Sequence, residues 1–291
     1  MTYYDRPVLK EPVWILTVPA YFYSGAAGGA AAVLGAVAQR DPQLRGLAAR
    51  CRWIAAVGGG AGTVLLIADL GRPARFLNML RVFRPSSPMN VGSWVLAIAS
   101  ALASVSALTT RSRGWRGRVG DLAGTGAGLA GLPLAGYTGV LLATTAIPAW
   151  NGAQRGLPLL SLASGVAGAA SLLEVMDLDG REAAVVRRYG VAGKAAELVA
   201  AAAVEREVGR VPVAAKPYHE GASAALWRAS KAATAASLFL ALASRRSRVV
   251  RVASGVTGTV GSLALRFALF QAGRASSRDP RATFEQQRSW S

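Results

Sequence analysis

Residues 68–80 read ADLGRPARFLNML and lie between two long apolar runs, residues 53–68 and 91–108. The segment places Asp69 and Arg72 at the rim of an otherwise apolar stretch of chain. Charged groups at the edge of a bilayer are costly unless they are paired or used in function. We therefore interpret residues 68–80 as the connection between two membrane spans and as the first place to look for chemistry.

The composition is that of a membrane protein. Of 291 residues, 52% are hydrophobic and only 16% are charged, whereas an ordinary soluble domain has about 25% charged residues. The apolar residues form blocks of about twenty, the length of helix that crosses about 30 Å of hydrocarbon. The sequence predicts an all-α, polytopic transmembrane helix bundle with about eight spans. The predicted spans are residues 13–38, 48–69, 88–109, 119–144, 156–178, 183–206, 225–243 and 250–272.

We expect residues 1–291 to form a single membrane domain, with a short N-terminal segment (1–12) and a C-terminal tail (273–291). The N-terminal segment contains acidic residues, and the apolar run after it is too long for the core of a signal peptide. We therefore expect the first span to remain in the protein. The sixth span is unusual because it carries five charges, so we expect it inside the bundle or at the interface. These charges are Arg187, Arg188, Lys194, Glu197 and Glu205.

The net charge of +18 comes largely from arginines between the apolar blocks, as in residues 111–118 and 245–248. Arginines in such loops interact with anionic lipid head groups and help to set membrane topology. A nucleic-acid-binding protein would need a basic face on a soluble surface, and the predicted spans leave none. We therefore expect membrane lipids, and no nucleic acid, as partners.

The chain has one cysteine, Cys51, and one histidine, His219. An iron–sulfur cluster takes about four cysteines, and one histidine cannot ligate a haem on both faces. We therefore expect no metal site, no haem and no iron–sulfur cluster in this chain. If the chain handles electrons, it must receive them from another subunit or from a diffusible carrier.

Small residues recur four positions apart, a spacing that lets helices approach closely in lipid. An alternative is that the chain is simply rich in alanine and glycine. The pairs are Gly25 and Gly29, Gly58 and Gly62, and Gly124 and Gly128.

Polar and aromatic residues of the first four spans converge on one membrane face. We call this face side A, because it holds the N-terminal end, and the opposite face side B. The alternation of spans brings the start of the first and third spans, and the end of the second and fourth, to side A. The residues concerned are Trp14, Tyr21, Asp69, Arg72, Asn90, Ser93, Trp94, Tyr137 and Thr138.

Such a cluster suits a lipophilic ligand with a polar head, such as a quinone. Tyr137 can donate a hydrogen bond, Arg72 can hold developing negative charge, and Asp69 can relay a proton or orient Arg72. These three residues are the catalytic candidates, and the other six are expected to line the site. The alternative is that the aromatic residues form an interface belt and that the Asp–Arg pair only stabilises a loop.

Ionisable residues deeper in the chain form a second group: Glu174, Lys194 and Glu197, with Lys231 and Arg266 towards side A. Together they could line a proton path across the membrane. The alternative, which we favour, is that Lys194 and Glu197 neutralise each other, because residues three apart lie on one helix face.

Residues 68–76 resemble the DLGRPxRF signature of the NrfD-type family, the membrane subunits of polysulfide reductases. Four further segments agree with it in order along the chain. They are RPVLKEPVW at 6–14, SPMNVGSW at 87–94, YTGVLL at 137–142 and AGRASSRDP at 272–280.

The resemblance implies a bundle of eight or more helices without haem, in the cell's inner (cytoplasmic) membrane. It also implies a ferredoxin-like 4Fe-4S partner, commonly a molybdopterin catalytic subunit, and electron exchange with quinone, in particular menaquinone. Carried over by position, Tyr137, Asp69 and Arg72 are the site residues. Some relatives have a histidine in the first span, where this chain offers Tyr21 or Tyr23. A proton- or ion-translocating module and a passive anchor without a quinone site remain alternatives.

Overall fold

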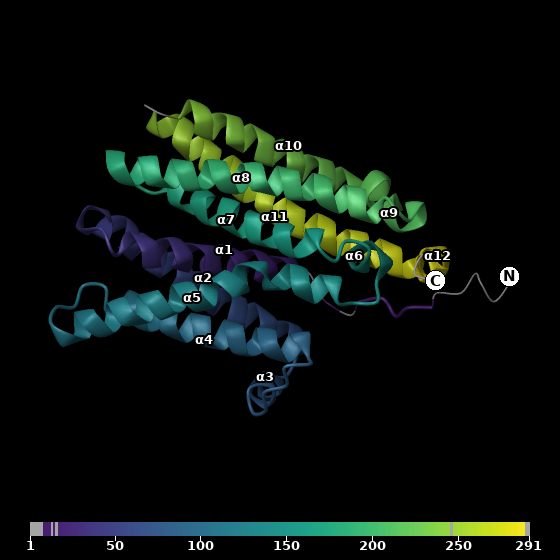
Figure 1. Cartoon of the computed structure of the whole chain (residues 1–291), viewed down its shortest axis with the longest axis horizontal. Helices are drawn as coiled ribbons and strands as arrows, with labels where there is room; N and C mark the ends of the chain where they lie inside the picture. Colours follow the sequence, from purple (N-terminus) through teal and green to yellow (C-terminus); the bar gives the residue numbers. More distant parts are fainter. Residues whose placement is uncertain (1–7, 13, 15–16, 245–246, 289–291) are drawn as a thin grey trace.

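A computed structural model describes residues 8–12, 14, 17–244 and 247–288. Over these ranges the chain forms helices and no strand, which confirms the predicted all-α bundle (Figure 1). Eight long helices run back and forth along one direction. They are α1 (Thr17–Ala38), α2 (Arg45–Leu70), α4 (Pro88–Leu108), α5 (Trp115–Ala143), α7 (Gly156–Val175), α8 (Gly180–Val208), α10 (Gly221–Ala243) and α11 (Arg248–Arg278).

Each of the eight predicted spans falls on one of these long helices. Six of them are long and apolar enough to cross a membrane, namely α1, α2 with the short turn before it, α4, α5, α7 and α11. The other two, α8 and α10, are more polar. Within α8 the charged side chains Lys194 and Glu197 are buried between helices, as we expected for the sixth span.

Short helices occur mainly at one end of the bundle. Figure 1 shows α3 (Pro73–Met79), α6 (Pro148–Asn151), α9 (Pro212–His219) and α12 (Pro280–Arg288) at the end where α1 begins and α11 finishes. This end is side A. Side B has only tight turns and the 3-10 helix η2 (Pro42–Leu44) within the described ranges. The extra structure on side A gives that face more surface on which a site or a partner can be built.

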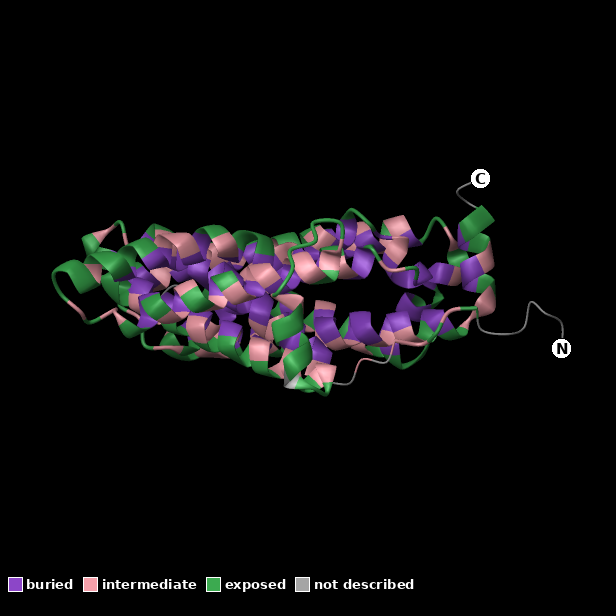
Figure 2. Ribbon diagram, turned by 90° about the horizontal axis from the view of Figure 1, so that it is seen from below, coloured by how far each residue is buried: buried purple, intermediate pink, exposed green. Residues whose placement is uncertain are grey.

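The two halves of the chain repeat one arrangement. In the first half, α1 packs on α2 and α5, and α4 packs on the same two helices. In the second half, α7 packs on α8 and α11, and α10 packs on the same two. The halves meet where α7 lies against α1 and α5. Figure 2 shows buried residues between the helices and exposed residues on the outside of the bundle.

Glycines make the closest helix contacts, as predicted for some of the small-residue pairs. A Cβ atom on Gly29 of α1 would lie 2.6 Å from the carbonyl oxygen of Gly131 on α5. A Cβ atom on Gly58 of α2 would lie 2.7 Å from the carbonyl oxygen of Ser24 on α1. Backbones at this separation leave no room for a side chain, so these positions set the spacing of α1, α2 and α5.

The N-terminal segment is tied to the last long helix by Glu11. Its carboxylate accepts hydrogen bonds from Arg274 Nε at 2.5 Å and from Arg278 Nη2 at 2.9 Å. The hydrogen bonds from Arg278 and Arg274 hold the pKa of Glu11 below its usual value. The segment before α1 is therefore joined to the end of α11 at side A.

Candidate functional site

Two tyrosines lie buried where the first four long helices meet. Tyr21 of α1 is buried and packs against α2. A Cβ atom added to Gly62 of α2 would lie 3.5 Å from the Tyr21 ring. Tyr137 of α5 lies on Gly92 of α4, where any larger residue would overlap the phenol ring. The hydroxyl of Tyr137 donates to the carbonyl of Pro88, at the start of α4. Tyr21 and Tyr137 thus form the interior of the predicted side A cluster.

Asn90 and Ser93 hold the loop between α3 and α4. The Asn90 side chain accepts from the backbone N–H of Arg84 at 2.7 Å and donates to the carbonyl of Met79 at 2.6 Å. Ser93 Oγ donates to the carbonyl of Met89 at 2.9 Å. The polar groups of Asn90 and Ser93 therefore bind backbone, and neither projects a free donor towards Tyr137.

Trp94 differs from Asn90 and Ser93, because its side-chain N–H does not bind the backbone. Its indole Nε1 is buried and has no hydrogen-bond partner among the described residues. Its ring lies edge-on to Phe83, with centroids 6.2 Å apart. Gly92 and Trp94 are two residues apart and so lie on nearly opposite sides of α4. The structure therefore separates Trp94 from Tyr137, which the sequence placed in one cluster.

Asp69 and Arg72 lie at the rim of side A. Asp69 is half-buried in the last turn of α2, and Arg72 is exposed just before α3. The turn between them depends on Gly71, whose φ of 68° is a left-handed conformation that favours glycine. Arg75 Nη1 donates to the carbonyl of Leu70 at 3.1 Å and so closes the end of α2. The guanidinium of Arg72 faces the surface, where a partner or a lipid can reach it.

The remaining two predicted residues lie on the border between the halves. Trp14 stacks on Trp150 with ring centroids 5.7 Å apart, and so covers the contact of α6 with α11. Thr138 Oγ1 lies 2.5 Å from Ser161 Oγ of α7. Ser161 also receives hydrogen bonds from Arg266 of α11, at 2.7 Å on its hydroxyl and 3.0 Å on its carbonyl. Thr138 thereby connects α5 to a buried arginine.

The second group of predicted residues is buried, but its pairing differs from our expectation. Lys194 does not neutralise Glu197. Its ammonium instead binds Glu174 of α7 at 2.7 and 2.8 Å and Ser254 of α11 at 2.9 Å. The side chains of Lys194 and Glu174 are 0% and 2% exposed. The partner of Lys194 is thus Glu174 on the neighbouring helix α7. The spacing of residues within α8 alone could not predict this pair.

Glu197 has its own set of partners one turn closer to side A. Its carboxylate accepts from Thr234 Oγ1 of α10 at 2.6 Å and from Ser262 Oγ of α11 at 3.3 Å. With Arg266 beyond it, the buried polar groups run from Glu174 near side B to Thr138 near side A. We call these groups the polar interior. They come from α7, α8, α10 and α11, and Thr138 of α5 adjoins them at the side A end.

Ser161, Thr234, Ser254 and Ser262 of this interior were not predicted from the sequence, whereas Thr138 and Arg266 were. Ser254, Ser262 and Arg266 of α11 repeat at steps of eight and four residues, which keeps them on one helix face. That spacing is visible in the sequence and links the two serines to Arg266, which was predicted. The same signal is present in two other helices, since Ser161 recurs with Ser164 and Ser171 in α7, and Thr234 with Ser230 and Ser237 in α10, at steps of three, four or seven residues.

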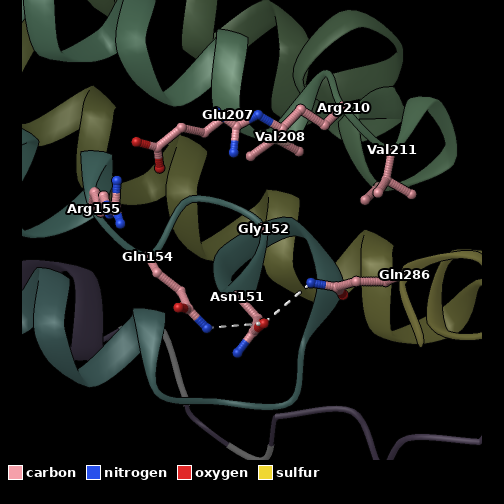
Figure 3. A pocket seen from close by; sticks show the side chains of 10 residues that line it. Asn151, Gly152, Gln154, Arg155, Glu207, Val208, Arg210, Val211 and Gln286 are labelled. Atoms are coloured by element: carbon pink, nitrogen blue, oxygen red, sulfur yellow. Dashed lines mark hydrogen bonds between the residues drawn. The ribbon is translucent and has the colours of Figure 1, made fainter. Parts of the chain in front are cut away.

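A cavity lies at side A in the second half of the chain, away from the predicted cluster. It has a volume of about 430 Å³ and is open between α6, α8, α9 and α12 (Figure 3). Asn151 Oδ1 accepts from Gln154 at 3.4 Å and from Gln286 at 3.2 Å across its floor. None of the residues that we expected to contact a quinone lines this cavity.

One donor of the predicted cluster, the indole N–H of Trp94, fits a quinone head group. A quinone carbonyl accepts a hydrogen bond, and the buried Nε1 of Trp94 is a donor without an acceptor among the described residues. Phe83 and Trp94 supply adjoining aromatic surface. Over the described residues the structure contains no group of histidine, cysteine and acidic residues that could hold a metal ion.

Comparison with known proteins places this architecture in a family. A search of curated protein sequences gives no match to the chain. A family model described as polysulfide reductase, of the NrfD type, matches residues 2–278. This match covers nearly all of the chain, including every predicted span and every predicted site residue. The chain therefore belongs to the NrfD-type polysulfide reductase family of membrane subunits.

Proposed function

We propose that this chain is the quinone-interacting membrane subunit of a multi-subunit respiratory oxidoreductase. It would exchange electrons between an iron–sulfur subunit and the quinone pool, with menaquinone as the expected quinone. The observation that carries the proposal is the buried indole N–H of Trp94 in α4, which has no partner among the described residues and lies next to Phe83 of the loop after α3. Membership of the family supports it.

Four residues of the cluster have roles in this proposal: Trp94, Tyr137, Asp69 and Arg72. The bound quinone supplies a carrier for two electrons and two protons. Trp94 Nε1 orients one carbonyl by a hydrogen bond. Tyr137 lies on the opposite side of α4 from Trp94, so its hydroxyl, held by the Pro88 carbonyl, would supply a proton by way of water at the start of α4 and not by direct contact. Asp69 and Arg72, at the rim, connect the site to water and favour the developing negative charge.

The same proposal includes partners. A ferredoxin-like 4Fe-4S subunit would dock on side A, where the short helices and Arg72 offer a surface, and a molybdopterin-containing or other catalytic subunit would join it. The assembly would lie in the inner (cytoplasmic) membrane. A short distance between the partner's cluster and the Asp69 rim follows from this arrangement, because the electrons must reach the quinone there.

Two substitutions test the quinone site in the purified complex. Tyr137→Phe removes the hydroxyl proton and is expected to lower the kcat for quinol-linked turnover by about 100-fold, a common contribution of a positioned proton donor. Trp94→Phe removes only an orienting donor, so it is expected to raise KM for quinol. The measurement is steady-state turnover with a soluble quinol analogue.

Tyr189→Phe is the matched control for Tyr137→Phe. Tyr189 is also a tyrosine of a long helix whose hydroxyl donates to a backbone carbonyl, that of Ala30, at 2.9 Å. Its variant is expected to keep normal turnover. Unchanged kcat in Tyr137→Phe would remove Tyr137 from the mechanism, and unchanged KM in Trp94→Phe would leave a passive anchor as the better description.

The buried polar interior favours a second candidate function, proton translocation coupled to the redox partner. From Ser254 to Arg266 the polar face of α11 extends over about 18 Å, and Glu197 lies beside it. Polar groups inside a membrane domain are costly and often mark ion or proton pathways. Glu197 would be the group that gains and loses the proton, since Lys194 is already paired with Glu174.

Glu197→Gln tests this second function in liposomes that contain the complex. We expect proton uptake or release to be lost while quinol-linked electron transfer continues, because the quinone cluster lies in the other half. Glu220→Gln, an exposed acid on side A, is the matched control and is expected to translocate normally. Translocation that persists in Glu197→Gln would contradict the path.

A further inference from the structure

Four arginines line a cavity at side B. The cavity has a volume of about 360 Å³ and lies where α1 and α4 end and α2 and α5 begin. Arg45, Arg52, Arg113 and Arg118 border it, and Asp121 is the one carboxylate in its lining among the described residues. This leaves three positive charges in excess, in a concave site at a membrane face. None of these residues takes part in the quinone cluster or in the polar interior.

Arg52 is held rigidly at the base of this cavity. Its side chain is only 10% exposed, and its Nη2 donates to Asp121 Oδ1 at 2.6 Å and to Gln39 Oε1 at 2.8 Å. Gln39 is fixed in turn by donating to Thr125 Oγ1 at 2.7 Å. The Nε atom of Arg52 has no hydrogen-bond partner among the described residues. The site therefore has a buried, positioned guanidinium whose donors are not all used.

The other three arginines are available to a ligand. Arg45, Arg113 and Arg118 are exposed, and in the described part of the chain none of them forms an ion pair. Asp121 is already bound to Arg52. Nothing within the described residues neutralises the three guanidinium groups that surround the opening, so the cavity is suited to an anion.

The surroundings place the cavity at the level of lipid head groups. Trp53 and Trp115, which are 50% and 71% exposed, lie close to it in the chain, and exposed tryptophans favour the membrane–water interface. Leu108, the last residue of α4, and Leu122, which follows Asp121 in α5, are each 75% exposed. Such leucines suit contact with acyl chains. The cationic cavity and an apolar outer surface therefore adjoin.

We propose that this cavity binds the phosphate group of an anionic membrane phospholipid. Arginine presents a planar fork of donors that matches phosphate oxygens. Basic pockets between transmembrane helices are suited to such head groups. Free phosphate shares this chemistry, but the leucines beside the cavity favour a ligand that carries acyl chains. The lipid would join α1, α2, α4 and α5 at the end of the bundle opposite to the quinone cluster.

Two double variants of the full chain in detergent test the site. Arg113→Gln with Arg118→Gln removes two arginines of the cavity, whereas Arg111→Gln with Arg116→Gln removes two exposed arginines of the same loop that do not line it. Phosphatidylglycerol binding is measured by native mass spectrometry. We expect the first variant to bind about 30-fold more weakly than the unmodified chain. The second should bind as the unmodified chain does, and phosphatidylcholine should not compete.

Three outcomes would overturn the proposal. Equal loss of phosphatidylglycerol in the two double variants would show a general charge effect. Phosphatidylcholine carries the same phosphate but a compensating choline, so its binding as tightly as phosphatidylglycerol would show that the cavity does not select an anionic head group. Inorganic phosphate that binds alone as tightly as the lipid would make the free ion the occupant. Circular dichroism of both variants checks that the substitutions leave the helices intact, as expected for exposed side chains.

Discussion

Lys194→Met is expected to lower the free energy of unfolding in detergent micelles by about 3–5 kcal/mol. The substitution leaves Glu174 buried with Ser254 as its remaining partner, and a buried carboxylate without a countercharge is strongly destabilising. Chemical denaturation followed by tryptophan fluorescence measures the change. We expect the free energy of unfolding to fall even if the helix content of the folded variant is unchanged.

The double variant Lys194→Met with Glu174→Gln separates charge from packing. It removes both charges, so it should recover most of the stability that Lys194→Met loses. Lys216→Met is the matched surface control, because Lys216 pairs with Glu220 at 3.7 Å with both side chains mainly exposed. It should change stability by no more than about 0.5 kcal/mol. A double variant as unstable as Lys194→Met would contradict the importance of the pair.

Gly131→Leu is expected to destabilise the bundle by about 3 kcal/mol, through overpacking at the contact of α5 with α1. A Cβ atom at this position would lie 2.5 Å from the carbonyl oxygen of Gly29, which is backbone and cannot turn aside. The helices must therefore separate. Loss of thermal stability, together with faster exchange of the α1 and α5 amides, is the measurement.

Gly60→Leu is the control for this effect of size. Gly60 lies exposed on α2, and a Cβ atom added to it would meet no other atom within 4 Å among the described residues. Leucine there should leave stability unchanged or improve it, since glycine is a poor helix former. Equal destabilisation at Gly60 and Gly131 would mean that the close approach of α1 and α5 does not hold the fold together.

The helices could be predicted from the sequence because bilayer thickness fixes the length of an apolar block. Six of the eight predicted spans fall on long apolar helices for this reason, while the other two, on the more polar α8 and α10, also fall on long helices. The pairing of Lys194 could not be predicted in the same way. Its partner Glu174 is on another helix, and only the packing of α7 against α8 brings the two together.

The direction of each helix could be predicted from the sequence, and with it the membrane face on which each site residue lies. Alternating helices do bring Tyr21, Asp69, Trp94 and Tyr137 to side A. Rotation of each helix about its axis decides which side chains meet, and this rotation depends on contacts such as that of Tyr137 with Gly92. Sequence position therefore indicated the membrane face, while the division of the cluster between two sides of α4 required the structure.

The contact of Glu11 with Arg274 and Arg278 has a consequence for biosynthesis. These residues are separated by more than 260 positions, so the contact cannot form until the ribosome has synthesised α11. Insertion of the earlier helices must then proceed without the contact of Glu11 with these two arginines. Completion of the last long helix would act as a latch that secures this segment after the other helices are in place.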